Sequence, residues 1–161
     1  MPSDFVAWCI QNMVVHNPDW SVRMLNGHNL SSVLRRPLPH RFHEWTHTQC
    51  SDWARLALLY ERGGVWMDAS VLVLAGVECW VDVHGEYDIQ GFQFPKSSDV
   101  LETWAMAATP RNPFVLHWLE EWEEALGMGV EDYCQRNQVK IHPSLNDSLP
   151  YLAVNSSHNR V

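Results

Sequence analysis

Residues 51–70 read SDWARLALLYERGGVWMDAS, and this stretch decides the fold that the sequence predicts. The part before the two glycines is apolar around more than one helical turn, which is typical of a helix buried on several sides. Gly63 and Gly64 interrupt that pattern, and the apolar run after them predicts a short strand that leads into Asp68. A helix, a glycine turn and a strand in this order predict an α/β protein.

The helix in this stretch has signals at both of its ends. Thr46 and Gln49 have the spacing of a capping box, so we expect the helix to begin at about His47. Gly63 follows Arg62 and is expected to end the helix in the left-handed conformation. The helix is therefore predicted over residues 47–62.

Helical and strand patterns alternate along the rest of the chain, which predicts an α/β sandwich built on a largely parallel sheet. Helices are expected at residues 4–16, at 113–126 and near Glu131, with a helical turn at 29–34. Short strands are expected at residues 20–25, 64–67, 71–74 and 89–94.

Composition limits the classes of function. The 161 residues are enough for one domain with a core, and no apolar run approaches the roughly 20 residues that span a bilayer. The net charge is −8, and the 11 Lys and Arg form no basic cluster beyond Arg35-Arg36. Because phosphate-backbone binding needs clustered cations, we expect no nucleic-acid partner. With no signal-peptide pattern at its start, the chain is expected to be soluble as given.

Three charged residues of the opening stretch are candidates for a ligand site. Asp52 and Arg55 are three residues apart, so they share one face of the helix, either as a local ion pair or as part of a site. Asp68 ends a strand, and ligands of open α/β sheets gather at carboxyl ends of strands. A carboxylate there can accept a hydrogen bond from a ribose hydroxyl or hold a cation that bridges phosphates. The alternative for Asp68 is an ordinary turn residue.

The opening stretch contains, in this order, S-D-x-x-R, an apolar helix, Y-x-x-G-G, a short strand and an Asp-containing motif. This ordered run resembles the signature of the capsular polysaccharide synthesis glycosyltransferases. These proteins are relatives of glycosyltransferase family 32, the DXD-containing sugar transferases. Weaker similarity covers residues 9–25, 102–110, 112–114 and 151–152. The resemblance implies a GT-A type fold, a Rossmann-like α/β/α sandwich. It also implies transfer of a sugar, with retention, from a nucleotide-diphosphate donor to a glycan or related acceptor.

The resemblance also implies roles for individual residues. Arg55 would meet the diphosphate charge, Asp68 would meet the ribose, and Glu102 would lie near the reacting sugar, although a surface position is the alternative for Glu102. The expected donor-binding residues are Ser51, Asp52, Arg55, Gly63, Gly64 and Asp68, with the two glycines leaving space for a sugar or base.

The implied metal site departs from the usual pattern. The motif reads Asp68-Ala69-Ser70, so Ser70 stands at the second acidic position. The expected cofactor is a divalent cation, Mn²⁺ or Mg²⁺, with Asp68 and Ser70 as its ligands. A neutral hydroxyl in place of a carboxylate predicts weaker metal affinity than a full DXD motif gives.

A second departure concerns the start of the chain. Relatives open with a strand of the P-K-I-I-W type that forms part of the nucleotide pocket, and this sequence shows no such strand before residue 4. We therefore expect a single glycosyltransferase domain over residues 1–161 that lacks the first strand. The competing hypothesis is a non-catalytic module that binds a nucleotide sugar or a protein partner without turnover.

Two other groups of residues suggest chemistry. His40, His43 and His47, with Glu44 between them, have a spacing seen in zinc hydrolases, but prolines and the predicted helix cap prevent a single helix from aligning them. Loop histidines are the favoured interpretation. Several tryptophans are candidates for sugar stacking, with a core position favoured for most: Trp45, Trp53, Trp66, Trp104, Trp118 and Trp122.

Overall fold

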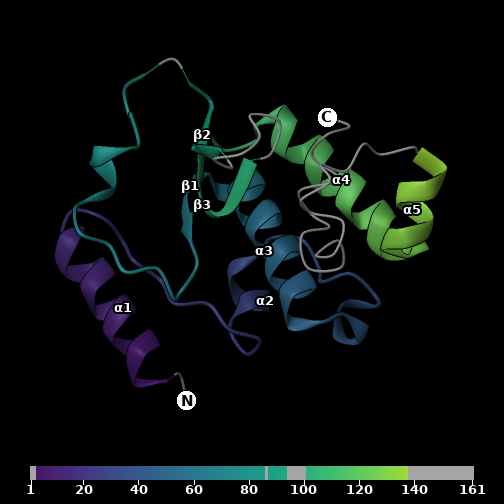
Figure 1. Cartoon of the computed structure of the whole chain (residues 1–161), viewed down its shortest axis with the longest axis horizontal. Helices are drawn as coiled ribbons and strands as arrows, with labels where there is room; N and C mark the ends of the chain where they lie inside the picture. The colour runs from purple at the N-terminus through teal and green to yellow at the C-terminus, as the bar shows by residue number, and fades with distance from the viewer. Residues whose placement is uncertain (1–2, 86, 94–100, 138–161) are drawn as a thin grey trace.

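The computed structural model describes residues 3–85, 87–93 and 101–137 (Figure 1). The helices are α1 (Asp4–His16), α2 (Leu30–Val33), α3 (His47–Arg62), α4 (Pro113–Met128) and α5 (Val130–Asn137). Two short 3-10 helices are η1 (Phe42–Glu44) and η2 (Val77–Cys79), and the strands are β1 (Gly64–Met67), β2 (Ile89–Gln93) and β3 (Leu101–Ala108). The α/β class is thus confirmed. Phe94 and residues 151–152, which also carried expectations, lie outside the described residues.

The start of α3 is as predicted, whereas its end differs in one detail. The Thr46 side chain accepts a hydrogen bond from the Gln49 N–H, and the Gln49 side chain accepts one from the Thr46 N–H. Gly63 ends the helix with φ 65° and ψ −159°. The positive φ agrees with the prediction. The ψ differs from that of the predicted left-handed helical conformation, because the chain turns directly into the extended strand β1. This conformation strongly favours glycine.

The sheet differs from the predicted one. Its order is β1-β3-β2, and both pairs are antiparallel, so the expectation of a largely parallel sheet is wrong for the described strands. For the β2–β3 pair, the reason is the short connection between the two strands. Only residues 94–100 separate these strands, whereas parallel neighbours need a crossover of a dozen or more residues.

Two predicted strands do not form. Residues 71–74 begin at a turn in which the Val71 N–H donates to the Asp68 carbonyl, and Leu74 is 84% exposed. Residues 20–25 also lie outside any strand. In both places the β-branched residues have no paired neighbour in the described structure, and strand propensity takes effect only through such pairing and burial.

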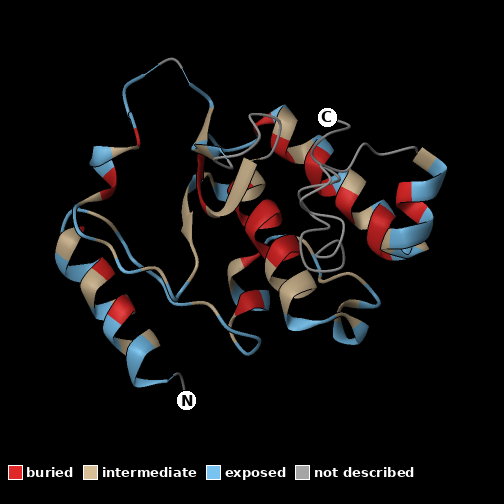
Figure 2. Cartoon of the chain, viewed as in Figure 1, coloured by how far each residue is buried: buried red, intermediate tan, exposed pale blue. Residues whose placement is uncertain are grey.

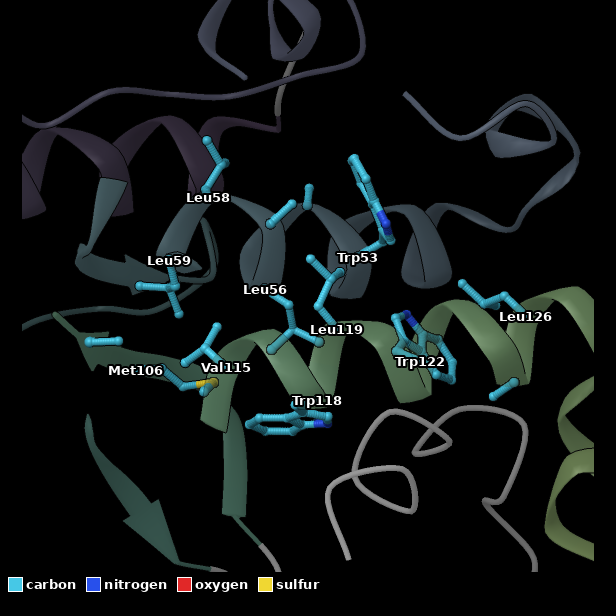
Figure 3. Packing of buried hydrophobic residues seen from close by; sticks show 14 of the residues in the cluster. Trp53, Leu56, Leu58, Leu59, Met106, Val115, Trp118, Leu119, Trp122 and Leu126 are labelled. Carbon is cyan, nitrogen blue, oxygen red and sulfur yellow. The ribbon is translucent and has the colours of Figure 1, made fainter. Parts of the chain in front are cut away.

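The main core lies between α3 and α4 (Figures 2 and 3). Trp53, Leu56 and Trp118 are fully buried, and burying one such side chain contributes about 1.5–3 kcal/mol or more. Trp122 is 1% exposed, so the core positions expected for Trp53, Trp118 and Trp122 are confirmed. This packing fixes α3, the helix that carries Asp52 and Arg55, as a rigid support.

A smaller apolar cluster connects the sheet to the segment after β1. Val77 and Val81 pack with Ala107. Asn17, which is 2% exposed, donates to the Met13 carbonyl at 2.7 Å and accepts from the Val77 N–H at 2.7 Å. The end of α1 is thereby tied to η2. Among the described residues, none of the helices has the length and apolar character required to cross a membrane.

Candidate functional site

The α3–turn–β1 unit returns the chain to the beginning of α3 and so brings the predicted charged residues together. Arg55 Nη2 lies 3.1 Å from Asp52 Oδ1 and 3.3 Å from Asp68 Oδ1. Asp52 and Arg55 are each only 4% exposed. The guanidinium therefore bridges one buried carboxylate on the helix and one carboxylate at the end of the strand.

Asp68 is held firmly, yet part of its carboxylate is free. Its N–H donates to the Trp104 carbonyl at 2.8 Å, and its Oδ1 accepts from Trp66 Nε1 at 2.9 Å. The Arg55 contact also falls on Oδ1. The side chain is 36% exposed, and no described residue hydrogen-bonds Oδ2. Asp68 can therefore accept a hydrogen bond from a ligand without giving up its protein contacts.

Trp66 was expected to be either a core residue or a stacking residue. Its ring also lies 5.5 Å from the Arg55 guanidinium carbon, which is a cation–π contact. The signal was present in the sequence, because residues i and i+2 of a strand share a face, which places Trp66 beside Asp68.

Arg55 itself is a buried bridge. Its side chain is 5% exposed, and its Nε is buried without a hydrogen-bond partner in the described structure. Because the guanidinium faces Asp52 and Asp68, it acts on a ligand through Asp68 in this conformation. Direct contact with a diphosphate stays a prediction that requires Arg55 to reorient.

Burial changes the acidity of Asp52. The pKa of this carboxyl is raised to about 7, chiefly by desolvation on burial; the nearby Arg55 charge opposes the rise and the Asp68 charge adds to it. When Asp52 is neutral, Arg55 and Asp68 form a balanced pair. When Asp52 is ionised, the cluster carries one excess negative charge.

An open cleft of about 880 Å³ runs beside β1. Its walls are α1, residues 20–25, the second half of α3, and β1 with the three residues after it. The cleft is lined by Asp68 and Ser70, which follow β1, and also by Ser51 of α3. The volume falls in the range of about 300–1,000 Å³ that is usual for small-molecule sites.

The two glycines line the cleft, but they differ in how much room they leave. A Cβ at Gly63 would lie 2.7 Å from Pro110 Cδ, so the space expected there for a sugar is filled by protein. A Cβ at Gly64 would meet nothing within 4 Å. Gly63 precedes β1 and Gly64 is its first residue, whereas Asp68 follows the strand, so Gly64 lies about 13 Å from Asp68 at about 3.3 Å per residue. They therefore belong to the other end of the cleft.

Ser70 and Glu102 are placed differently. Ser70 is exposed and lines the cleft, and its carbonyl accepts from the Cys9 thiol at 3.7 Å. Glu102 pairs with Phe92 in the sheet and is not part of the cleft lining. The structure thus brings Ser70, but not Glu102, to the same cleft as Asp68.

The site offers few protein ligands for a metal ion. Within residues 3–85, 87–93 and 101–137, no group of three or more His, Cys, Asp or Glu is arranged to hold one. Asp68 Oδ2 and the Ser70 hydroxyl fit a Mg²⁺ or Mn²⁺ ion only if phosphate oxygens complete its coordination. His40 and His43 are exposed, before and within η1, and they are not part of any such group among the described residues.

A carboxylate at the end of a strand, backed by a buried arginine and opening on a cleft, defines a candidate site for a polar ligand. Residues 2–124 match the sequence model of the capsular polysaccharide synthesis protein family. The chain belongs to this family.

Three named relatives are similar over part of their length. An O-glycosyltransferase, braB, of Annulohypoxylon truncatum is 30% identical over 122 residues, which cover 64% of this chain and 29% of that protein. The pyruvylated Gal-beta-1,3-epitope synthesis protein 2 of Schizosaccharomyces pombe is 26% identical over a region that covers 74% of this chain and 34% of that protein. The glycosyltransferase afumC of Aspergillus fumigatus is 27% identical over a region that covers 92% of this chain and 46% of that protein.

The chain therefore spans less than half the length of each of these relatives. No solved structure matches the chain.

Proposed function

We propose that this chain is the donor-binding part of a glycosyltransferase with a GT-A type fold, and that it binds a nucleoside-diphosphate sugar at the Asp68 end of the cleft. The observation that carries the proposal is the fixed Asp68 carboxylate. Trp66 and Arg55 hold its Oδ1, which leaves Oδ2 for a ligand. Membership of a family whose relatives include named glycosyltransferases supports the sugar-transfer class.

Asp68 is the residue that contacts the donor in this proposal. A ribose hydroxyl donates to Oδ2, and a hydrogen bond to an ionised carboxylate contributes about 1.5–3 kcal/mol. Arg55 and Trp66 are positioning residues, since they fix the direction of Oδ2 before the donor arrives. Asp52, which contacts Arg55, sets the net charge of the cluster through its own protonation state.

A divalent cation fits the site as a shared ligand of protein and donor. Asp68 Oδ2 and the Ser70 hydroxyl would hold it together with phosphate oxygens of the donor. A bound cation would supply charge neutralisation for the diphosphate that leaves. Because the chain contributes a single carboxylate, the donor must bring most of the coordination, and cation and donor should bind together.

In the proposed transfer, the bond between the anomeric carbon and the diphosphate oxygen breaks, a bond to an acceptor hydroxyl oxygen forms, and the proton of that hydroxyl passes to the departing diphosphate. Retention at the anomeric carbon is proposed from the family resemblance. The role of Glu102 near the reacting sugar stays a prediction, because the structure does not bring that residue to the cleft.

Turnover tests the function. The full chain with Mn²⁺ is incubated with UDP-, GDP- and other nucleotide sugars, and release of the nucleoside diphosphate is followed. Asp68→Asn should reduce release at least about tenfold, whereas Asp19→Asn, an exposed carboxylate elsewhere, should not. Binding without release would instead favour a non-catalytic nucleotide-sugar module.

A further inference from the structure

Three aromatic side chains outside the main core form a row of rings in contact, which we call the aromatic row: Trp80, Phe92 and Trp104. The Phe92 ring of β2 stacks on the Trp104 ring of β3, with ring centroids 4.8 Å apart and planes 15° from parallel. Trp80, which follows η2, contacts the Phe92 ring at a centroid distance of 5.1 Å. All three residues are half-buried, whereas Trp53 and Trp118 of the main core are fully buried. The row therefore presents aromatic surface that a ligand can reach.

The aromatic row is formed at a bulge in the sheet. The register of β2 against β3 shifts immediately before Phe92, so that residues 103–105 have no partner on β2. In a regular ladder Phe92 would pair with Ala105, but it pairs with Glu102 instead and stacks on Trp104. Bulges re-aim side chains, and they are over-represented next to active sites. The bulge is therefore the local feature that brings the two rings together.

The same bulge brings a carboxylate to the row. Glu102 is paired with Phe92, and side chains that lie directly opposite each other share a face of the sheet, with Cβ atoms about 4.5–5.5 Å apart. Glu102 is half-buried, and its carboxylate forms no hydrogen bond or ion pair with another residue in the described part of the chain. Its oxygens can therefore accept hydrogen bonds from hydroxyl groups of a ligand that lies on the row.

The aromatic row adjoins the proposed donor site at Asp68. The Asp68 N–H donates to the Trp104 carbonyl at 2.8 Å, so these residues are neighbours across the two strands. The three residues of the row do not line the cleft, whereas Asp68 does. Asp68 is thus next to both the cleft and the row. A sugar acceptor must bring its hydroxyl oxygen to the anomeric carbon of the donor, so it has to bind within reach of the donor site.

We propose that the aromatic row and Glu102 form the acceptor site, and that this site binds a pyranose ring of a glycan acceptor; the proposal rests on the proposed glycosyltransferase function. The faces of a pyranose ring carry C–H bonds, because most of its hydroxyls point outward around the ring. These C–H bonds are slightly positive and pack on the negative face of an aromatic ring. Glu102 accepts hydrogen bonds from the outward hydroxyls. The sugar on Trp104 lies nearest to Asp68 and presents the reacting hydroxyl.

Saturation-transfer NMR tests the site without any nucleotide. The full chain is titrated with the methyl glycosides of glucose, galactose, mannose and N-acetylglucosamine. At least one of them should bind, and its C–H protons on one ring face should receive the most saturation. Trp104→Leu keeps an apolar side chain but has no aromatic face, so it should raise the dissociation constant of that glycoside at least about fivefold. Trp104→Phe keeps an aromatic face and should raise it less.

Two further variants separate binding from folding. Glu102→Gln keeps the shape of the side chain and loses its charge, so it should weaken glycoside binding at least about threefold. Trp8→Leu is the matched control, because Trp8 is an exposed tryptophan of α1, and it should bind as the wild type does. Thermal unfolding verifies that each variant is folded. If Trp104→Leu does not fold, Glu102→Gln decides the test, and wild-type affinity in that variant contradicts the proposal.

Two other results would overturn the acceptor site. The first is that none of the four glycosides binds, or that folded Trp104→Leu binds them as the wild type does. The second is that UDP displaces the glycoside and loses its own affinity in Trp104→Leu, which would assign the row to a nucleobase, because bases also stack on aromatic side chains. Glycoside binding without release of a nucleoside diphosphate from any donor would contradict the proposed function alone.

Discussion

Arg55 and Asp68 are separated by 13 positions in the sequence, yet Arg55 Nη2 lies 3.3 Å from Asp68 Oδ1. The contact joins the buried helix α3 to the end of β1. It depends on the turn at Gly63, where the chain reverses direction and runs back alongside the helix. The same guanidinium also contacts Asp52, so the helix and the strand share one buried cation.

This shared cation makes Arg55 important for stability. Replacing it in Arg55→Met leaves Asp52 buried without its partner, so the free energy of unfolding should fall by about 3–5 kcal/mol. Urea unfolding measures the change. Arg41→Met is the matched control, because the exposed Arg41–Glu44 pair should contribute less than about 1 kcal/mol. Adding Asp52→Asn to Arg55→Met should recover part of the loss, since it removes the unpaired charge. A loss below about 1 kcal/mol in Arg55→Met would contradict the bridging role.

Asp52 should make stability depend on pH. Its folded pKa of about 7 lies above the ordinary Asp value of 3.8, so between these values the folded chain binds one more proton than the unfolded chain. The contribution of Asp52 is therefore fully present below about pH 4 and is lost as the pH rises through about 7, with a slope of up to about 1.4 kcal/mol per pH unit.

Unfolding free energies of the wild type and of Asp52→Asn, measured from pH 4 to 8, isolate this contribution, because the other groups cancel in the difference. The stability of Asp52→Asn relative to the wild type should rise with pH across this window. A difference that does not change with pH would show that Asp52 titrates normally.

Ser70 gives a prediction about the cation. Mn²⁺ should strengthen nucleotide binding by the wild type, because the diphosphate supplies ligands that the protein lacks. Ser70→Asp adds a second carboxylate and should strengthen the Mn²⁺ effect by about tenfold, whereas Ser70→Ala should weaken it slightly. Calorimetric titrations with Mn²⁺ and with a chelator compare the three proteins. If the chelator leaves nucleotide binding unchanged in all of them, the cation has no part in the site.

Local signals predicted the α3–β1 unit well, because its helix cap, its buried helix and its glycine turn depend on neighbouring residues. The carboxylate at Asp68 and its closeness to Asp52 and Arg55 follow from the same unit. The antiparallel sheet was missed, since strand direction depends on which distant strands pair. The strand β3 was not among the strands predicted from the residue pattern, because LETWAMAA lacks a clear alternation of apolar and polar residues.

Other features needed the folded chain. The spacing of Asp52 and Arg55 was consistent with a local ion pair or with part of a site. The ion pair is present, but its burial and the additional contact of Arg55 with Asp68 become visible only in the folded chain. Gly63 was interpreted as space for a sugar, but Pro110, far along the chain, fills that space. Such contacts between distant segments leave no trace in the spacing of residues.

The most direct test of the account is whether a nucleoside diphosphate binds at Asp68. Calorimetry of UDP and GDP with the full chain and Mn²⁺ should show one site for at least one of these nucleotides. Asp68→Asn keeps the side-chain shape and an oxygen for Trp66, but loses the charge that a ribose hydroxyl or a cation needs. Its affinity should fall by about 10- to 150-fold, equivalent to about 1.5–3 kcal/mol. Asp19→Asn should bind as the wild type does. Equal affinity in Asp68→Asn and the wild type would show that Asp68 does not contact the nucleotide.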